Sequence, residues 1–342
     1  ISAVVGIAVL AGIVLAGVRS LLSRADRGFE RGSASDKSHP VKFRGEERLS
    51  LIPDPPLAEL APTMVGRADQ EARMRSVFET AAQGHARLLC LTGEPGIGKS
   101  TLTQDFLDRL RKEKEPCLIA RGRCSERLAG TEAYLPVVEM LESLLRSRNG
   151  DRLAETMKQL APTWYFRIAP LGADDSSDSR LRDDARAASQ ERMKRELFTL
   201  IQELSRSSPI VLFFDDVHWA DASTVDLLAY IGARGDGLCL LTIATYRPSE
   251  LVLTDHPFVG VKRELQARGV CEEIALGFLG REDISHYLDL ELPDHEVPDT
   301  LVDFVHARTD GSPLFMVNVI RYLQETGAII ERDGWRLELL AF

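Results

Sequence analysis

The sequence predicts an α/β protein built on a doubly wound, parallel five-stranded sheet. A glycine-rich segment, GEPGIGKS at residues 93–100, joins a short apolar run to a stretch with helical periodicity. A second apolar run, residues 210–214, ends in the pair Asp215 and Asp216. Apolar runs without polar alternation are typical of strands buried on both faces of a parallel sheet. Both features should therefore lie at the carboxyl edge of the sheet, where such folds bind ligands.

Five apolar runs of this kind are expected to form the strands. They cover residues 86–92, 116–122, 209–215, 238–248 and 272–279. Stretches with helical periodicity separate them, and the clearest of these, residues 133–146 and 189–204, fall between the second and third runs. Alternation of strand and helix predicts helices on both faces of the sheet.

The glycine-rich segment has the form G-x-x-x-x-G-K-S, a loop whose backbone N–H groups and following helix N-terminus surround phosphates. We expect Lys99 to reach the β and γ phosphates of a nucleotide, Ser100 to ligate Mg²⁺, and Thr101 to lie near the α phosphate. The expected loop residues are Gly93, Glu94, Pro95, Gly96, Ile97, Gly98, Lys99, Ser100 and Thr101. A glycine-rich turn without a ligand is the alternative, but the strand–loop–helix context favours a nucleotide site.

The acidic pair after the third run predicts the rest of the metal and hydrolysis site. Asp215, at the strand end, should hold Mg²⁺ through water, and Asp216 is placed to orient or deprotonate an attacking water. Two capping aspartates at a strand-to-loop junction would be the purely structural interpretation. His218 either lines the site or packs beneath the loop, and Asp221 precedes a helical stretch as its N-cap.

Arginines supply two further expectations. Arg247 ends the fourth run, where a guanidinium beside the phosphates could sense the γ phosphate and stabilise charge in the transition state. A surface arginine before a proline turn is the alternative. Five others are candidates for an arginine that acts on a neighbouring molecule, although solvated helix faces explain them more simply: Arg121, Arg123, Arg127, Arg192 and Arg195.

The N-terminal stretch predicts a membrane anchor. Residues 1–18 carry no charge and would form a helix of about 27 Å, close to the hydrocarbon thickness of a bilayer. Arginines follow it, which would keep that side in the cytoplasm. A buried helix of an upstream soluble domain is the alternative. Residues 19–62 are polar and then proline-rich, as in a linker next to a membrane.

Composition argues against one class of partner. The chain has 52 acidic and 42 basic residues and a formal charge of −10. That balance speaks against a large contact surface for nucleic-acid phosphates, so we expect no direct nucleic-acid contact from this segment. The five cysteines are scattered without C-x-x-C spacing, which is typical of reduced core thiols.

Five motifs together resemble a known family. MVGRADQEARM, GEPGIGKST, VLFFDDVHWAD, ATYRP and DGSPLF occur in the order found in bacterial STAND-class signal-transduction ATPases. These proteins are AAA-like P-loop NTPases related to origin-recognition proteins. They often carry a Ser/Thr kinase or adenylyl cyclase domain and TPR-like repeats. The resemblance covers about residues 63–342.

The resemblance implies a division of the chain and further nucleotide contacts. It implies a P-loop ATPase domain over residues 63–279, a helical lid over 280–325 and the start of a winged-helix unit over 326–342. Val65, Gly66 and Arg67 match the family's N-terminal box near the adenine. Pro313 matches the lid proline that touches the nucleotide base, although from the residues alone it is only a first helical position.

The expected function is a slow, ATP-binding and ATP-hydrolysing signalling switch that uses ATP, ADP and Mg²⁺. It would self-associate through the ATPase domain, regulate attached effector modules or partner proteins, and work in the cytoplasm, anchored to the inner membrane. Many AAA-type ATPases carry Glu at the position of Asp216, and the shorter base fits slow turnover. The alternatives are an AAA-like ATPase that acts on DNA and, less in keeping with the acidic pair, a small-molecule kinase.

Overall fold

Alternating residues of the five central strands face two different layers of helices. The strands are β1 (Arg87–Thr92), β2 (Leu118–Arg123), β3 (Ile210–Asp215), β4 (Leu240–Tyr246) and β5 (Cys271–Ala275). All neighbouring pairs are parallel, in the order β2-β3-β4-β1-β5, so the predicted parallel five-stranded sheet is confirmed. Leu89 and Phe213 belong to one core and Cys90 and Phe214 to the other, as the two-residue period of a strand requires.

The computed structural model describes residues 64–113, 117–126, 132–147, 150–168, 189–292 and 297–327, together with two strands of two residues each. No helix within these ranges is both long and apolar enough to cross a membrane. The membrane helix predicted at residues 1–18 and the linker at 19–62 lie outside the described residues.

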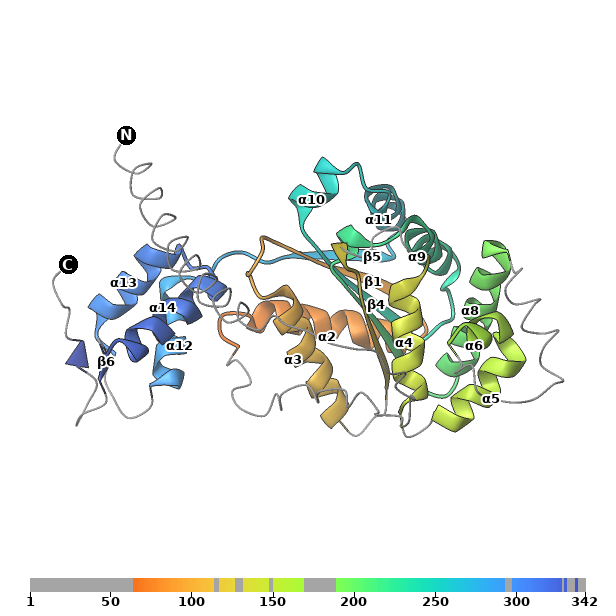
Figure 1. Ribbon diagram of the computed structural model, residues 1–342, viewed down its shortest axis with the longest axis horizontal. Coiled ribbons are helices and arrows are strands. Elements are labelled where there is room, and N and C mark those ends of the chain that lie inside the picture. The colour runs from red at the N-terminus through yellow and green to blue at the C-terminus, as the bar shows by residue number, and fades with distance from the viewer. Residues whose placement is uncertain are drawn as a thin grey trace, which may run out of the picture. The chain divides into compact units, whose positions relative to one another are not determined.

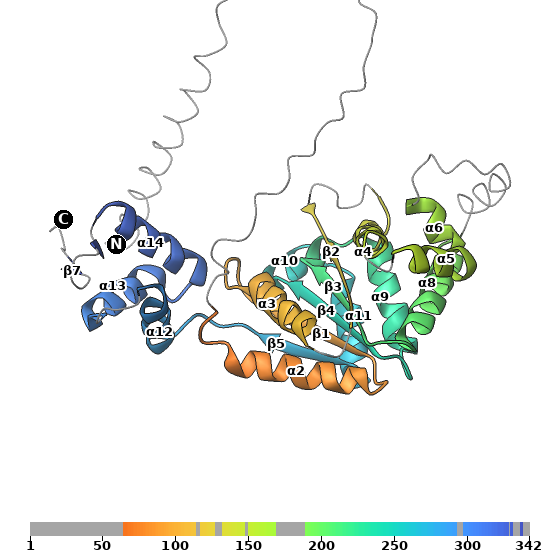
Figure 2. The same ribbon diagram turned by 90° about the horizontal axis from the view of Figure 1, so that it is seen from below.

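One face of the sheet is covered by α2 (Ala68–Ala82) and α3 (Lys99–Lys112), whose apolar sides pack on β1, β3 and β4 (Figures 1 and 2). The other face is covered by α9 (Ala222–Arg234) and α11 (Phe258–Ala267). Asp221 caps α9, because its side chain accepts the N–H of Thr224 at 3.0 Å, as the sequence predicts.

A helical insertion between β2 and β3 extends the second core. Its helices are α4 (Leu135–Leu145), α5 (Gly150–Leu160), α6 (Pro162–Ile168) and α8 (Gln190–Ser205). Trp164 is fully buried against Tyr134, and its indole N–H donates to the carbonyl of Met193 at 2.8 Å. The helical pattern predicted between the second and third runs is confirmed.

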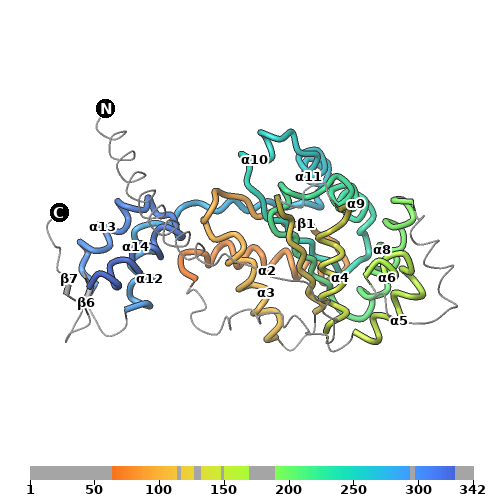
Figure 3. The backbone as a smooth tube through the Cα atoms, in the orientation of Figure 1, coloured from red at the N-terminus to blue at the C-terminus, as the bar shows by residue number. Residues whose placement is uncertain are grey.

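After β5 the chain enters a group of three helices with a core of its own (Figure 3). The helices are α12 (Arg281–Glu291), α13 (Asp299–Thr309) and α14 (Pro313–Glu325). We call this group the lid. Strands β6 (Ile329–Ile330) and β7 (Arg336–Leu337) follow as an antiparallel pair, and the winged-helix unit expected at residues 326–342 remains a prediction.

Two short elements follow β3 and β4. The 3₁₀ helix η3 (Val217–Trp219) comes directly after the acidic pair. Helix α10 (Pro248–Leu253) begins after Arg247, with Pro248 in its first turn. Both elements therefore start at the carboxyl edge of the sheet, where the glycine-rich loop between β1 and α3 also lies.

Candidate nucleotide-binding site

The glycine-rich loop turns the chain from β1 into α3. Gly96 and Gly98 have φ values of 75° and 96°, in the left-handed region that favours glycine. Gly98 is the N-cap of α3 and has no side chain to occupy the first-turn N–H groups. The loop can therefore offer these N–H groups, and the positive end of the helix, to an anion.

Lys99 folds back over the loop that precedes it. Its Nζ donates to the carbonyl oxygens of Gly93 at 2.8 Å and Glu94 at 3.0 Å. The residue is 6% exposed, and burial lowers the pKa of its ammonium. The charge of Asp216 acts in the opposite direction. A buried cation that is bonded only to neutral carbonyls is well placed to pair with an anionic ligand.

Asp215 is the centre of a hydrogen-bond network at the end of β3. Its Oδ1 accepts from Ser100 Oγ and from Thr245 Oγ1, both at 2.7 Å. Thr245 also accepts the backbone N–H of Asp216 at 2.8 Å. The loop serine, the acidic pair and β4 are thus tied together in one network, in which Asp215 and Thr245 are buried.

Asp216 is held in a strained conformation beside that network. Its φ is 59°, which a non-glycine residue adopts at a cost. Burial raises the pKa of its carboxyl, and the nearby charge of Asp215 adds to the effect. Local backbone strain, as at Asp216 after the carboxyl end of β3, is typical of functional positions.

His218 and Arg247 flank Asp216 from the two following elements. His218 Nδ1 lies 3.9 Å from Asp216 Oδ1, and neither ring nitrogen has a hydrogen-bond partner among the described residues. Burial lowers the pKa of His218 to about 4. The buried Nε of Arg247 also lacks a partner within the described part of the chain. Arg247 lines the cavity beside Asp216, so its unpaired donor points to a polar ligand, whereas His218 packs beneath the site and does not line the cavity.

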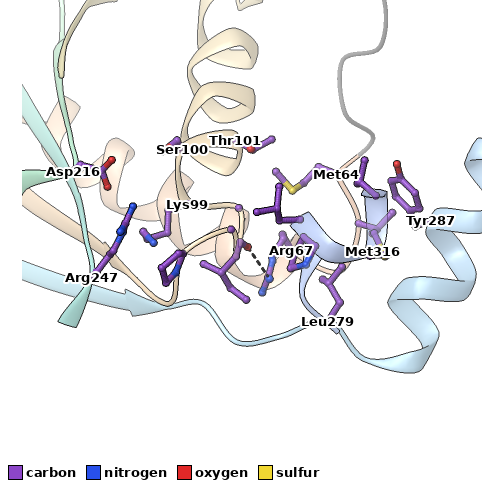
Figure 4. A pocket seen from close by; sticks show the side chains of 18 residues that line it. Met64, Arg67, Lys99, Ser100, Thr101, Asp216, Arg247, Leu279, Tyr287 and Met316 are labelled. Atoms are coloured by element: carbon purple, nitrogen blue, oxygen red, sulfur yellow. Dashed lines mark hydrogen bonds between the residues drawn. The ribbon is translucent and has the colours of Figure 1, made fainter. Parts of the chain in front are cut away.

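A cavity runs from Asp216 and Arg247 to the lid (Figure 4). Its volume of about 350 Å³ is within the range of small-molecule sites. Asp216 and Arg247 lie at one end and Met64, Tyr287 and Met316 at the other, with Lys99 between them (Figure 4). One end of the cavity is therefore charged and the other largely apolar, as the phosphates and base of a nucleotide would require.

Arg67 closes the cavity beside the loop. It is 6% exposed, and its Nη2 donates to the carbonyl oxygens of Gly277 at 2.7 Å and Ile97 at 3.4 Å. Burial lowers the pKa of this guanidinium. Arg67 thus links the start of the described chain, the loop and the segment that follows β5.

The lid meets the loop directly. The backbone N–H of Leu314, in the first turn of α14, donates to the carbonyl of Gly96 at 3.2 Å. Pro313 is the first residue of α14 and lines the cavity. In the turn between α13 and α14, the carbonyl of Gly311 accepts the backbone N–H of Leu279 at 2.8 Å.

The structure brings most of the predicted site residues to one cavity. Those that line it are Val65, Arg67, Pro95, Gly96, Ile97, Gly98, Lys99, Ser100, Thr101, Asp216, Arg247 and Pro313. Asp215 lies behind Ser100. Gly93 and Glu94 do not line the cavity; their carbonyl oxygens accept hydrogen bonds from Lys99. Gly66 does not line the cavity either, and its Cα packs against the carboxylate of Asp283, where a Cβ would lie 2.4 Å away.

The sequence reasoning missed several residues of the site. The apolar end of the cavity includes Met64, Leu279, Tyr287, Leu314, Met316 and Val317. Met64 and Leu314 belong to two of the quoted motifs but were given no role, and no motif marks the other four. Thr245 could have been found, because it is the penultimate residue of a buried strand, two residues before Arg247. Arg121 was weighed as an arginine that acts on a neighbouring molecule or as a solvated side chain. It lies on β2, and its guanidinium is bonded to Asp215 of the same chain.

The residues at the charged end fit a magnesium ion that is bound together with a nucleotide. In the described part of the chain no group of three or more His, Cys, Asp or Glu side chains could hold a metal alone. Mg²⁺ at a nucleotide site needs few protein ligands, because phosphate and water oxygens supply the others. The Ser100 hydroxyl donates to Asp215, which leaves the lone pairs of Oγ for a cation.

Solved structures with a related arrangement come from several kinds of protein. The chain is 13% identical to a RuvB mutant of Thermotoga maritima, with a TM-score of 0.41 and coverage of 79% of this chain and 66% of that one. The chain is 14% identical to a STAND protein with a tetratricopeptide repeat sensor from Pyrococcus horikoshii. The TM-score is 0.40, and the match covers 74% of this chain and 29% of that one. The chain is 12% identical to Drosophila ORC bound to DNA, with a TM-score of 0.46 and coverage of 93% of this chain and 71% of that one. Likenesses of this size do not distinguish one function from another.

A sequence relative is the uncharacterized protein R02095 of Rhizobium meliloti (strain 1021). It is 22% identical over 294 residues, which cover 80% of this chain and 26% of that protein. The chain thus spans about a quarter of the length of this relative.

The family described as AAA ATPase domain matches residues 63–242, more than half of the 342-residue chain. The match contains the glycine-rich loop, the acidic pair and the strands that carry them. This family implies nucleotide binding at the loop. The chain belongs to the AAA ATPase domain family.

Proposed function

We propose that this chain is an ATP-operated switch, a slow ATPase of the STAND type whose lid responds to the bound nucleotide. One contact carries the proposal: the Leu314 N–H bonded to the Gly96 carbonyl joins the lid to the loop that would hold the phosphates. Any ligand that reshapes the loop acts on this bond. Nucleotide state and lid position would therefore be coupled through a contiguous contact.

Each end of the cavity has a role in the proposal. Lys99 exchanges its two carbonyl partners for the β and γ phosphates, and the loop N–H groups hold the remaining oxygens. The base lies against Val65, Tyr287 and Pro313 at the apolar end. Ser100, as a direct ligand, and Asp215, through water, would hold Mg²⁺, and the ion would supply positive charge that stabilises the phosphates.

Hydrolysis would depend on Asp216 and Arg247. Asp216 accepts a hydrogen bond from the attacking water and removes its proton, and its carboxyl, whose pKa burial has raised, is a stronger base than an exposed aspartate. Arg247 directs its guanidinium to the γ phosphate. An aspartate reaches less far than a glutamate, which fits slow turnover.

The proposal includes features that lie beyond the cavity. Self-association through the ATPase domain and control of effector modules are proposed from the resemblance to STAND proteins. A cytoplasmic position with an anchor in the inner membrane is proposed from residues 1–18 alone. The formal charge of −10 and the lid contact favour the switch over an enzyme that acts on DNA.

The deciding experiment compares the full chain with the Lys99→Ala and Asp216→Asn variants. Affinity for ATP and ADP, Mg²⁺-dependent ADP release and protease sensitivity of the lid would be measured for each. We expect Lys99→Ala to lose nucleotide binding. Asp216→Asn should keep binding, since Asn tolerates the left-handed conformation, and lose hydrolysis by roughly 10²-fold or more.

Three results would count against the switch. Fast turnover without a change in lid protection would contradict it. ADP release that depends on one metabolite would favour a small-molecule kinase. A salt-sensitive complex with DNA would favour the DNA-directed ATPase.

A further inference from the structure

Arg121 is bonded to the aspartate that would support the metal. It lies on the edge strand β2, and its Nη2 donates to Asp215 Oδ2 at 2.7 Å. The guanidinium also lies over the ring of Phe213, 5.2 Å from its centroid, and reaches Gln104 Oε1 at 3.3 Å. The Arg121 side chain is 43% exposed, whereas that of Asp215 is 4% exposed.

The bonds to Asp215 leave little room for another partner. A carboxylate has about four lone-pair positions. Ser100 and Thr245 occupy both positions of Oδ1, and Arg121 occupies one of Oδ2. A water of a magnesium ion that bonded to Asp215 would have to share Oδ2 with the guanidinium.

We propose that Arg121 is a positioning residue that competes with Mg²⁺ for Asp215 and so sets the Mg²⁺ concentration at which nucleotide binds tightly. The inference rests on the proposed nucleotide site. Mg²⁺ keeps several of its waters, and those waters need acceptors with negative charge. The guanidinium removes one acceptor and places a like charge beside the dication.

The surroundings of Arg121 allow it to leave. Its side chain is partly exposed, and its other contacts, to Gln104 Oε1 and the Phe213 ring, are to uncharged groups. Asp215 is buried and already tied to Ser100 and Thr245. Exchange of Arg121 for a hydrated cation therefore needs a side-chain movement but no change in the sheet.

A purely structural role makes the opposite prediction. If Arg121 only neutralises a buried carboxylate, its removal leaves Asp215 less ordered and weakens metal binding. If Arg121 competes, its removal leaves both positions of Oδ2 free and strengthens metal binding. The sign of the change in Mg²⁺ dependence separates the two roles.

The test is a Mg²⁺ titration of fluorescent ADP binding to the full chain, starting in EDTA. Arg121→Gln should lower the half-maximal Mg²⁺ concentration by about fivefold or more, with ADP affinity in EDTA nearly unchanged. Arg123→Gln is the matched control for the loss of a nearby positive charge. Arg123 lies on the same side of β2 and its charge acts on Asp216, but within the described residues its guanidinium forms no ion pair with Asp215. Its Mg²⁺ dependence should stay within about twofold of that of the unmodified chain.

Two outcomes would overturn the inference alone: an unchanged or higher Mg²⁺ requirement in Arg121→Gln, or an equal decrease in both variants. Arg121→Lys, which keeps the charge and loses the planar fork, should give a smaller decrease and serves if Arg121→Gln does not fold. Failure of the unmodified chain to bind ADP at any Mg²⁺ concentration would instead remove the proposed function, and this inference with it.

Discussion

The backbone N–H of Leu314 donates to the carbonyl of Gly96 at 3.2 Å, which joins the first turn of lid helix α14 to the middle of the glycine-rich loop. The approach is close because Gly96 has no side chain. A Cβ at this position would lie 2.8 Å from Leu314 Cβ. The glycine is thus required both by its φ of 75° and by the lid.

Substitution of Gly96 should loosen the lid more than substitution of Gly98. Alanine at either position costs about 1–2 kcal/mol, because both have positive φ. Only at Gly96 would the new methyl also collide with Leu314, which adds about 1–3 kcal/mol, since nothing lies within 4 Å of a Cβ at Gly98. Hydrogen exchange of the α14 amides without nucleotide, with urea unfolding of both variants, measures the difference. Equal protection of α14 in the two variants would contradict the contact.

Thr245 should prove necessary for the geometry of the acidic pair. Thr245→Val keeps the shape of the side chain but removes both the acceptor for the Asp216 N–H and the donor to Asp215 Oδ1. We expect a loss of about 1–3 kcal/mol of stability and roughly tenfold or more of ATP hydrolysis. Thr245→Ser keeps the hydroxyl and is the control, with hydrolysis within a few-fold of the original. Equal hydrolysis by the two variants would show that the threonine only fills space.

His218 should make the protein less stable in mild acid. Burial lowers the pKa of His218 to about 4 in the folded state, against about 6.5 in the unfolded state. Well above pH 6.5 the imidazole is neutral in both states, so its protonation does not change the free energy of unfolding there. As the pH falls toward 4 the unfolded chain takes up the proton and the folded chain does not, so stability falls by about 2–3 kcal/mol in total.

Urea unfolding of the full chain between pH 7 and pH 4.5 measures this effect. His218→Leu removes the titrating group and should flatten the decrease in unfolding free energy. The exposed His286 on α12 provides the control, and His286→Gln should keep the original slope. An unchanged slope in His218→Leu would mean that the buried imidazole is not protonated on unfolding in this range.

The strands and the loop were predictable because their signals are local. Continuous apolar runs mark β1, β3 and β4, and the spacing of Gly93, Gly98 and Lys99 marks the turn between a strand and a helix. The same holds for Asp215 and Asp216, which directly follow a buried run. In each case a few consecutive residues contain the whole pattern.

Residues of the apolar end were not predictable in this way. Tyr287 and Met316 lie on lid helices and have the spacing of ordinary core residues. Their place at the cavity depends on how the lid packs after β5, and the contacts that fix that packing join residues far apart in sequence. Arg67 and Gly277, which are 210 positions apart, form one such contact.

The sequence by itself determined the parallel sheet, the phosphate loop and the acidic pair, because periodicity and spacing within short segments specify local conformation. Only the tertiary structure decided which side chains meet Asp215. Ser100, Arg121 and Thr245 come from three separate elements, and the strand order β2-β3-β4-β1-β5 brings them to the same carboxylate. A buried charge must be paired, but only the register of the packed strands determines its partners.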